Sequence, residues 1–149
     1  MNDDKIKELQ RKWFNLISDS TLIECGDGWF DLIDLLCRAI NSETTARANY
    51  GVEIVVKIDT IKQKFGGLRV YYDVEVSSKT HDNAYQDPAV IRGLGYIEGA
   101  VHMAELYSYH VCENCGNRGE CDPKANYFRT ECMACYTMNR DAQDDQYGI

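Results

Sequence analysis

The stretch that decides the fold runs from Val52 to Val76 and reads VEIVVKIDTIKQKFGGLRVYYDVEV. Apolar and polar residues alternate on both sides of Gly66-Gly67, which is typical of two strands that each bury one face. The pattern predicts an antiparallel pair of strands. Because the segment 60–65 is too long for a tight turn, we expect a longer connection between the two strands.

Helical patterns flank these strands. An apolar stripe with a helical period covers Asp3–Ile17, and Asn2 or Asp3 can cap it. A second stripe follows Gly26-Asp27-Gly28, where Asp27 has the character of an N-cap. The polar run 42–50 is expected to connect this second helix to the first strand.

A third helix is predicted from Asp87-Pro88 to about residue 110, with the aspartate as its cap and the proline at its first position. The polar segment 77–86 before it is expected to be a loop. Gly95 and Gly99 share the side of this helix opposite its apolar face. Two glycines four residues apart predict that something packs closely against them.

Five of the seven cysteines lie close together near the C-terminus, whereas Cys25 and Cys37 stand apart. The chain begins without the basic flank and apolar stretch of a signal peptide, and no apolar run reaches the roughly 20 residues of a membrane span. We therefore expect a cytoplasmic location and no membrane partner. In a reducing compartment, clustered cysteines indicate a metal site rather than disulfides.

The clustered cysteines form two C-x2-C pairs, and the predicted metal ligands are Cys112, Cys115, Cys132 and Cys135. Two residues between cysteines let both sulfurs reach one tetrahedral ion. Four thiolates leave no open coordination position, so the pattern predicts one structural zinc ion (Zn2+) and no catalytic metal. Cys121 has no partner at this spacing and is interpreted as a spare thiol.

The segment 112–140 resembles a treble-clef zinc finger. Its first cysteine pair lies in a turn, residues 127–130 have the character of a hairpin strand, and the second pair begins a segment without helix breakers. The resemblance implies a zinc-held fold and no particular activity, since zinc fingers serve many functions.

These elements together predict an α+β chain with helices packed on a small antiparallel sheet and a C-terminal treble-clef-like zinc finger. We expect an α+β domain over residues 1–110 and a finger over 111–140 that packs on it. An acidic tail is expected over 141–149.

A second candidate site surrounds the glycine pair of the strand region. Glycines let backbone N–H groups approach a ligand, basic side chains add positive charge, and an aromatic ring can stack on a planar group. The candidate ligand-binding residues are Lys64, Gly66, Gly67, Arg69, Tyr71 and Trp29. They would suit a small anion or a nucleotide, although the segment lacks the residue order of a P-loop or a dinucleotide loop. A glycine-containing hairpin connection with solvated lysines is the favoured interpretation.

Charge and missing motifs argue against DNA binding and catalysis. The net charge is −8, whereas binding to a phosphate backbone draws on Lys and Arg. The segment 112–140 carries acidic residues beside its four basic ones, so a DNA-binding regulator ranks last among the functions. There is no nucleophile–base pattern and no zinc-deaminase motif, so an enzyme is not expected. Asp27, Asp31 and Asp34 are interpreted as capping and solvated groups rather than metal ligands.

Three short motifs resemble those of small proteins from bacteria and their phages: GDGW at 26–29, KFGGLR at 64–69, and the cysteine pairs with FRTEC at 128–132. The resemblance implies a phage or prophage context and no activity. We therefore expect a non-catalytic, zinc-containing binding protein that inhibits or regulates a host macromolecule, with a host protein as its partner. The alternative is a protein that binds a small ligand or nucleotide through the Lys64–Arg69 loop.

Overall fold

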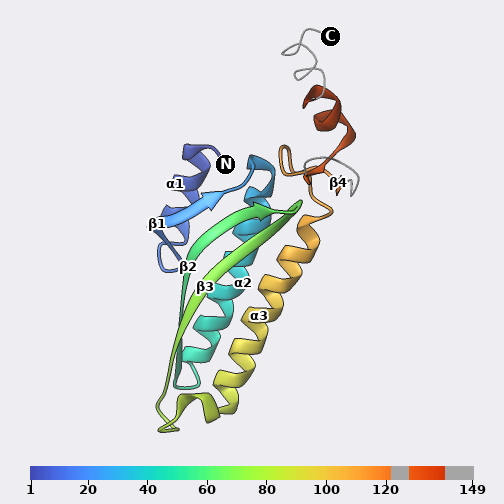
Figure 1. Cartoon of the computed structure of the whole chain (residues 1–149). Helices are drawn as coiled ribbons and strands as arrows, with labels where there is room; N and C mark the ends of the chain where they lie inside the picture. The colour runs from blue at the N-terminus through green and yellow to red at the C-terminus, as the bar shows by residue number, and fades with distance from the viewer. Residues whose placement is uncertain (122–127, 140–149) are drawn as a thin grey trace.

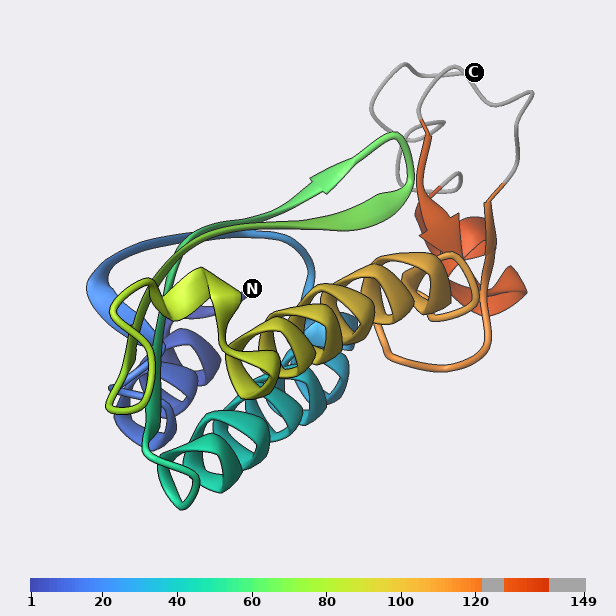
Figure 2. The ribbon, with the colours of Figure 1, turned by 90° about the horizontal axis from the view of Figure 1, so that it is seen from below.

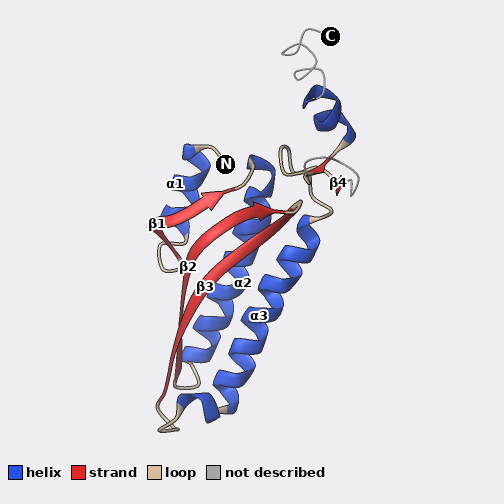
Figure 3. Ribbon diagram, viewed as in Figure 1, coloured by secondary structure: helices blue, strands red, loops and turns tan. Residues whose placement is uncertain are grey.

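The computed structural model describes residues 1–121 and 128–139, and the predicted tail 141–149 and residue 127 lie outside these ranges. The elements are α1 (Asp3–Lys12), β1 (Ile17–Glu24), the 3-10 helix η1 (Asp27–Trp29), α2 (Phe30–Ala48), β2 (Val52–Lys64), β3 (Gly67–Ser78), the 3-10 helix η2 (Ala84–Gln86), α3 (Pro88–Ser108), β4 (Glu120–Cys121) and β5 (Thr130–Glu131) (Figures 1 and 3). Residues 133–139 are also helical. The predicted α+β class is confirmed.

The main sheet is mixed rather than purely antiparallel as predicted. Its strand order is β1-β2-β3, with β1 parallel to β2 and β2 antiparallel to β3. The long helices α2 and α3 pack side by side against one face of this sheet (Figure 2). The core lies between these layers, and its largest fully buried side chains include Trp29, Leu9, Ile17, Ile33, Ile40, Ile61, Leu68 and Ile97.

Strand β1 is the element that the sequence pattern missed. The predicted helix over Asp3–Ile17 ends at Lys12, and Ile17 instead pairs with Ile58 of β2. Asn2 does cap this helix, because its side chain accepts a hydrogen bond from the Lys5 backbone N–H. The sequence of this strand is ISDSTLIE, and its first residues do not alternate regularly between buried and exposed positions. Only three of its eight residues are buried, so the usual pattern of a strand is absent.

The β2–β3 hairpin closes through a tight turn, so the predicted long connection is wrong. Lys64 pairs directly with Gly67, which leaves a two-residue turn at Phe65 and Gly66. Both turn residues have positive φ angles, 53° and 80°, as in a type I′ turn. A register shift at Asp59 adds one residue to β2, which lets the strand continue across the segment that had suggested a loop.

Several predicted boundaries also move. The polar run 42–50 is largely helical, because α2 continues to Ala48 and an ion pair between Arg47 and Glu43 (2.6 Å) spans one turn of it. Asp27 does not cap α2, and its carboxylate instead accepts hydrogen bonds from the backbone and side chain of Asn2. Part of the predicted loop 77–86 belongs to β3 and η2.

The two glycines in the middle of α3 are exposed. Apart from the backbone of α3 itself and the chain neighbours, no heavy atom of the described residues lies within 4 Å of a Cβ built at Gly95 or at Gly99, so the predicted close packing there is wrong. The close contact occurs at Gly93, where a Cβ would meet the Ile54 side chain at 2.5 Å. Among the described residues, no helix is long and apolar enough to cross a bilayer.

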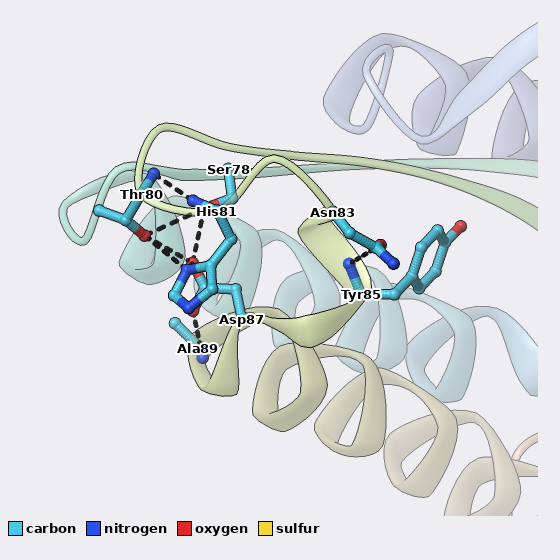
Figure 4. A network of polar contacts seen from close by, with 7 residues as sticks. All are labelled: Ser78, Thr80, His81, Asn83, Tyr85, Asp87 and Ala89. Atoms are coloured by element: carbon cyan, nitrogen blue, oxygen red, sulfur yellow. Dashed lines mark hydrogen bonds and ion pairs between the residues drawn. The ribbon is translucent and has the colours of Figure 1, made fainter.

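Asp87 caps α3, as the sequence predicted, and its carboxylate also binds hydroxyl groups at the end of β3 (Figure 4). One Asp87 oxygen accepts from the Ala89 backbone N–H at 2.8 Å, and the other accepts from the Ser78 and Thr80 hydroxyls at 2.6 and 3.0 Å. The hydrogen bond from Ser78, followed by that from the Ala89 N–H, lowers the pKa of Asp87 to about 2. This network joins the end of β3 to the first turn of α3.

Replacing Asp87 by asparagine is expected to change how stability depends on acidity. Because the folded pKa of about 2 lies below the unfolded value of about 3.9, the charged form of Asp87 stabilises the fold above pH 4. That stabilisation disappears as the pH falls from about 4 to about 2. Asn remains a good N-cap, so Asp87→Asn should be less stable than the wild type at pH 7 and approach it at pH 2. Denaturant unfolding at pH 7, 4 and 2 measures this, and a constant difference across the three pH values would contradict it.

Candidate metal centre

The four predicted cysteine ligands meet at one point. The sulfur atoms of Cys112, Cys115, Cys132 and Cys135 all lie within 4.8 Å of one another. The Sγ atoms of Cys115 and Cys132 are 3.6 Å apart. A tetrahedral ion with metal–sulfur bonds of about 2.3 Å needs sulfur–sulfur distances of about 3.8 Å, so the group can hold a metal ion. With four sulfur ligands, such a site has no open position for substrate or water.

Two local structures carry the cysteines. The first pair lies in a turn where the Gly116 N–H donates to the Cys112 carbonyl at 2.9 Å. Gly116 has a φ of 78°, which favours glycine at this position. The second pair begins the helix at 133–139, where the Tyr136 N–H donates to the Cys132 carbonyl at 2.9 Å. The short strands β4 and β5 pair antiparallel between the two cysteine pairs.

The thiols of the group differ in their ease of ionisation. The backbone N–H of Cys135 stabilises the Cys132 thiolate and lowers the pKa of Cys132 to about 7. Burial raises the pKa of Cys112 and of Cys135 above the usual thiol value. A bound cation would offset this cost, because metals bind the thiolate form.

The remaining cysteines lie outside this group. Cys121 is on β4, and its sulfur packs against Gly66 of the hairpin turn. Cys25 and Cys37 are buried in the main core, and burial raises the pKa of each to about 12. Such thiols stay protonated at neutral pH and are poor nucleophiles.

The GDGW motif packs directly on the first cysteine pair. The Gly28 N–H donates to the Glu113 carbonyl at 2.7 Å, and the Gly26 N–H donates to the Glu113 carboxylate at 2.9 Å. The buried Trp29 indole donates to the Val111 carbonyl at 2.8 Å. A Cβ at Gly28 would overlap the Cys112 carbonyl and the Gly116 nitrogen, so the close approach requires glycine.

The KFGGLR motif packs on the segment before the second cysteine pair. The buried Thr130 hydroxyl donates to the Gly66 carbonyl at 2.6 Å, and Gln63 donates to the Phe128 carbonyl at 2.5 Å. The Phe65 ring meets the Phe128 ring edge-on, with 6.3 Å between centroids. The hairpin tip and the GDGW segment therefore both bind the cysteine segment, which we define as residues 111–121 and 128–139. The body is residues 1–110.

The chain matches no protein-family model, no curated protein and no solved structure in the comparisons.

Most residues of the predicted ligand pocket make contacts within the protein instead. Trp29 is fully buried, so its predicted role in stacking on a ligand is wrong. The space beside Gly67 is filled by the Tyr109 ring, just as Cys121 fills the space beside Gly66. Arg69 donates to the Tyr109 hydroxyl at 2.9 Å and to the neighbouring Leu68 carbonyl.

Two other members of the predicted pocket remain accessible. The Lys64 ammonium lies 5.4 Å from the centre of the exposed Phe65 ring. Tyr71 is also exposed, and its ring centre lies 5.1 Å from the Lys62 ammonium. The interpretation of this segment as a hairpin connection is confirmed, although only Gly66 lies in the turn and Gly67 already belongs to β3.

Sequence reasoning missed Glu113 and Thr130 as the residues that connect the cysteine segment to the body. Both are buried, and both contact glycines of the two motifs. The available signal was the glycines themselves, since a glycine that is needed for close backbone approach implies a partner close by. The sequence does not name that partner.

Proposed function

We propose that the four cysteines hold one structural zinc ion in a treble-clef-type finger. We further propose that the chain is a non-catalytic binding protein of bacterial or phage origin that inhibits or regulates a host protein. The convergence of four sulfurs within 4.8 Å carries the zinc assignment. Four-sulfur sites of this kind suit zinc or iron, and zinc is the structural choice.

The order of elements supports a treble-clef type. A turn with the first cysteine pair precedes the β4–β5 pair of strands, and the second cysteine pair begins the final helix at 133–139. A zinc ribbon would end in a strand instead. The ion would then connect the turn to the helix without taking part in any reaction.

The exposed surface supports a role in binding another protein. Large apolar side chains are exposed on α3 and on the helix at 133–139, and exposed apolar side chains that gather on one surface mark interaction sites. They are Ile91, Tyr96, Met103, Leu106 and Tyr107 on α3, and Met133, Tyr136 and Met138 on the last helix. A chain with a net charge of −8 also favours partners with basic surfaces.

Native mass spectrometry of the protein purified with its metal tests the zinc assignment. We expect a mass equal to the chain plus one zinc ion, and loss of that mass with a strong chelator at neutral pH. A folded protein without metal, or one with iron, would contradict it.

Cross-linked capture from a bacterial lysate tests the binding role. We expect the wild type to retain a host protein that the double variant Met103→Glu, Leu106→Glu fails to retain, because both side chains are exposed on α3. The variant must keep one zinc ion and the wild-type melting temperature. If wild type and variant retain the same proteins, the proposed role of this surface is wrong.

A further inference from the structure

The outer edge of β3 is only partly occupied by the protein itself. In a strand paired on one side, the backbone groups of alternate residues point away from the partner strand. Near the hairpin tip, these outward N–H groups are bound by α3. The Leu68 N–H donates to the Ser108 hydroxyl at 2.8 Å, and the Val70 N–H donates to the Glu105 carboxylate at 3.0 Å.

Farther along the same edge, the outward residues are Tyr72, Val74 and Val76. The partner strand β2 lies on the other side of β3. Its residue Ile58 pairs with Tyr72 and donates its N–H to the Leu16 carbonyl, away from β3. Within residues 1–121 and 128–139, no hydrogen bond occupies the outer backbone groups of these three residues. An edge of this kind is a template for an additional strand.

A groove opens beside this edge at Tyr72. It has a volume of about 560 Å³ and lies between Tyr72 of β3 and the part of α3 that carries Gly95, Glu98 and Gly99. Among residues 1–121 and 128–139, nothing outside α3 itself lies within 4 Å of a Cβ built at either glycine, so the groove is open at these two positions. Each glycine lowers the stability of the helix by about 1 kcal/mol relative to alanine. The absence of a side chain at these two positions keeps the groove open.

The ionisable side chains of α3 that line the groove are the Glu98 and Glu105 carboxylates and the His102 imidazole. Glu98 and Glu105 are seven residues apart on α3, or about 10.5 Å along the helix axis. Side chains on one face of a strand recur every two residues, or about 6.8 Å, so two long basic side chains from one short strand can reach both carboxylates. Burial, followed by the charges of Glu98 and Glu105, raises the pKa of Tyr72, in agreement with the position of all three residues in the lining of the groove.

We propose that an extended, basic segment of a partner protein pairs with β3 at Tyr72–Val76 as a fourth strand and directs Lys or Arg side chains towards Glu98 and Glu105. This inference rests on the proposed function as a protein-binding protein and names the surface and chemistry of the partner. Backbone hydrogen bonds to the edge would supply affinity, and the carboxylates would select basic side chains.

A peptide of alternating valine and lysine, eight residues long with blocked ends, is the probe. Its binding to the zinc-loaded full chain is followed by amide NMR shifts and hydrogen exchange. We expect slower exchange at the Tyr72, Val74 and Val76 amides, and at least tenfold weaker binding when the central peptide amides are N-methylated. A valine–glutamate peptide should bind at least tenfold more weakly than the lysine peptide. Equal binding of the methylated peptide would overturn the proposal.

Gly99→Leu is the blocking variant, since it fills the groove at an exposed helical position. We expect a melting temperature at or above that of the wild type, together with at least tenfold weaker peptide binding. Thr45→Leu adds the same side chain to an exposed position of α2, outside the groove, and should bind the peptide as the wild type does. Unchanged binding to Gly99→Leu would overturn the proposal. So would concentration-dependent dimerisation that protects the same amides without peptide, because the edge would then serve a second copy of the chain.

The peptide assay and the lysate capture test two different claims, so a negative result in one does not decide the other. If the host protein is captured through α3 but the peptide does not bind, the edge proposal is wrong and the binding role stands. If the peptide binds the edge but no host protein is retained, the edge chemistry stands and the proposed cellular role is wrong.

Discussion

Replacing Gly28 by alanine is expected to destabilise the protein by about 3 kcal/mol or more and to weaken metal retention. The added Cβ would overlap the Cys112 carbonyl and the Gly116 nitrogen and lie 2.7 Å from the Cys115 nitrogen. All three are backbone atoms of the turn that carries the first cysteine pair, so they cannot move aside as a flexible side chain would. The free energy of unfolding and the bound zinc per chain are the two measurements.

Gly99→Ala is the matched control for this substitution. It makes the same chemical change in the middle of α3, where no described residue outside the helix itself lies within 4 Å of the new Cβ. We expect it to stabilise the protein by about 0.5–1 kcal/mol, because alanine is the better helix former, and to leave zinc retention unchanged. Equal stability changes in the two variants would show that the Gly28 contact does not determine the fold.

Replacing Cys132 by serine is expected to abolish stable metal binding and to lower the unfolding free energy by several kcal/mol. A ligand present at 1,000 times its Kd stabilises the folded state by about 4 kcal/mol, and this contribution is lost when one of four ligands is removed. Buried Cys112 and Cys135 would also lose the cation that offsets the cost of ionising them. Zinc content and thermal unfolding with and without chelator measure the effect.

Cys121→Ser is the control for the cysteine change. Cys121 lies on β4 outside the four-sulfur group, so this variant should retain one zinc ion and respond to a chelator as the wild type does. Cys132→Ser should show no further response to the chelator, because its metal is already gone. A Cys132→Ser protein with full zinc content would contradict the four-cysteine assignment.

The sequence could predict the elements whose signals are local. The alternation of apolar and polar residues over 52–76 corresponds to β2 and β3, and the Asp87-Pro88 pair marks the start of α3. The four ligands were predicted by their spacing alone, because two residues between cysteines already imply that both sulfurs point to one ion.

The errors fall where a distant partner decides the structure. Ile17 belongs to β1 because Ile58 lies beside it, and an apolar stripe that also suits a helix does not encode that pairing. The turn at Phe65-Gly66 was missed because Asn-Gly or Asp-Gly is the usual signal for a type I′ turn. The Phe65 ring packs against Phe128, which lies far away along the chain. A local sequence pattern carries no information about such a contact.

The attachment of the cysteine segment at two places has a kinetic consequence for the metal. The first cysteine pair is anchored to the body by Glu113, whereas the second pair follows Thr130, which is anchored to the hairpin turn. Departure of the ion would thus leave two half-sites near their final positions instead of a free chain. Metal uptake then needs only a short loop closure, whose entropy cost is small. Rapid reloading of the apo protein would follow from the same glycines that hold the fold together.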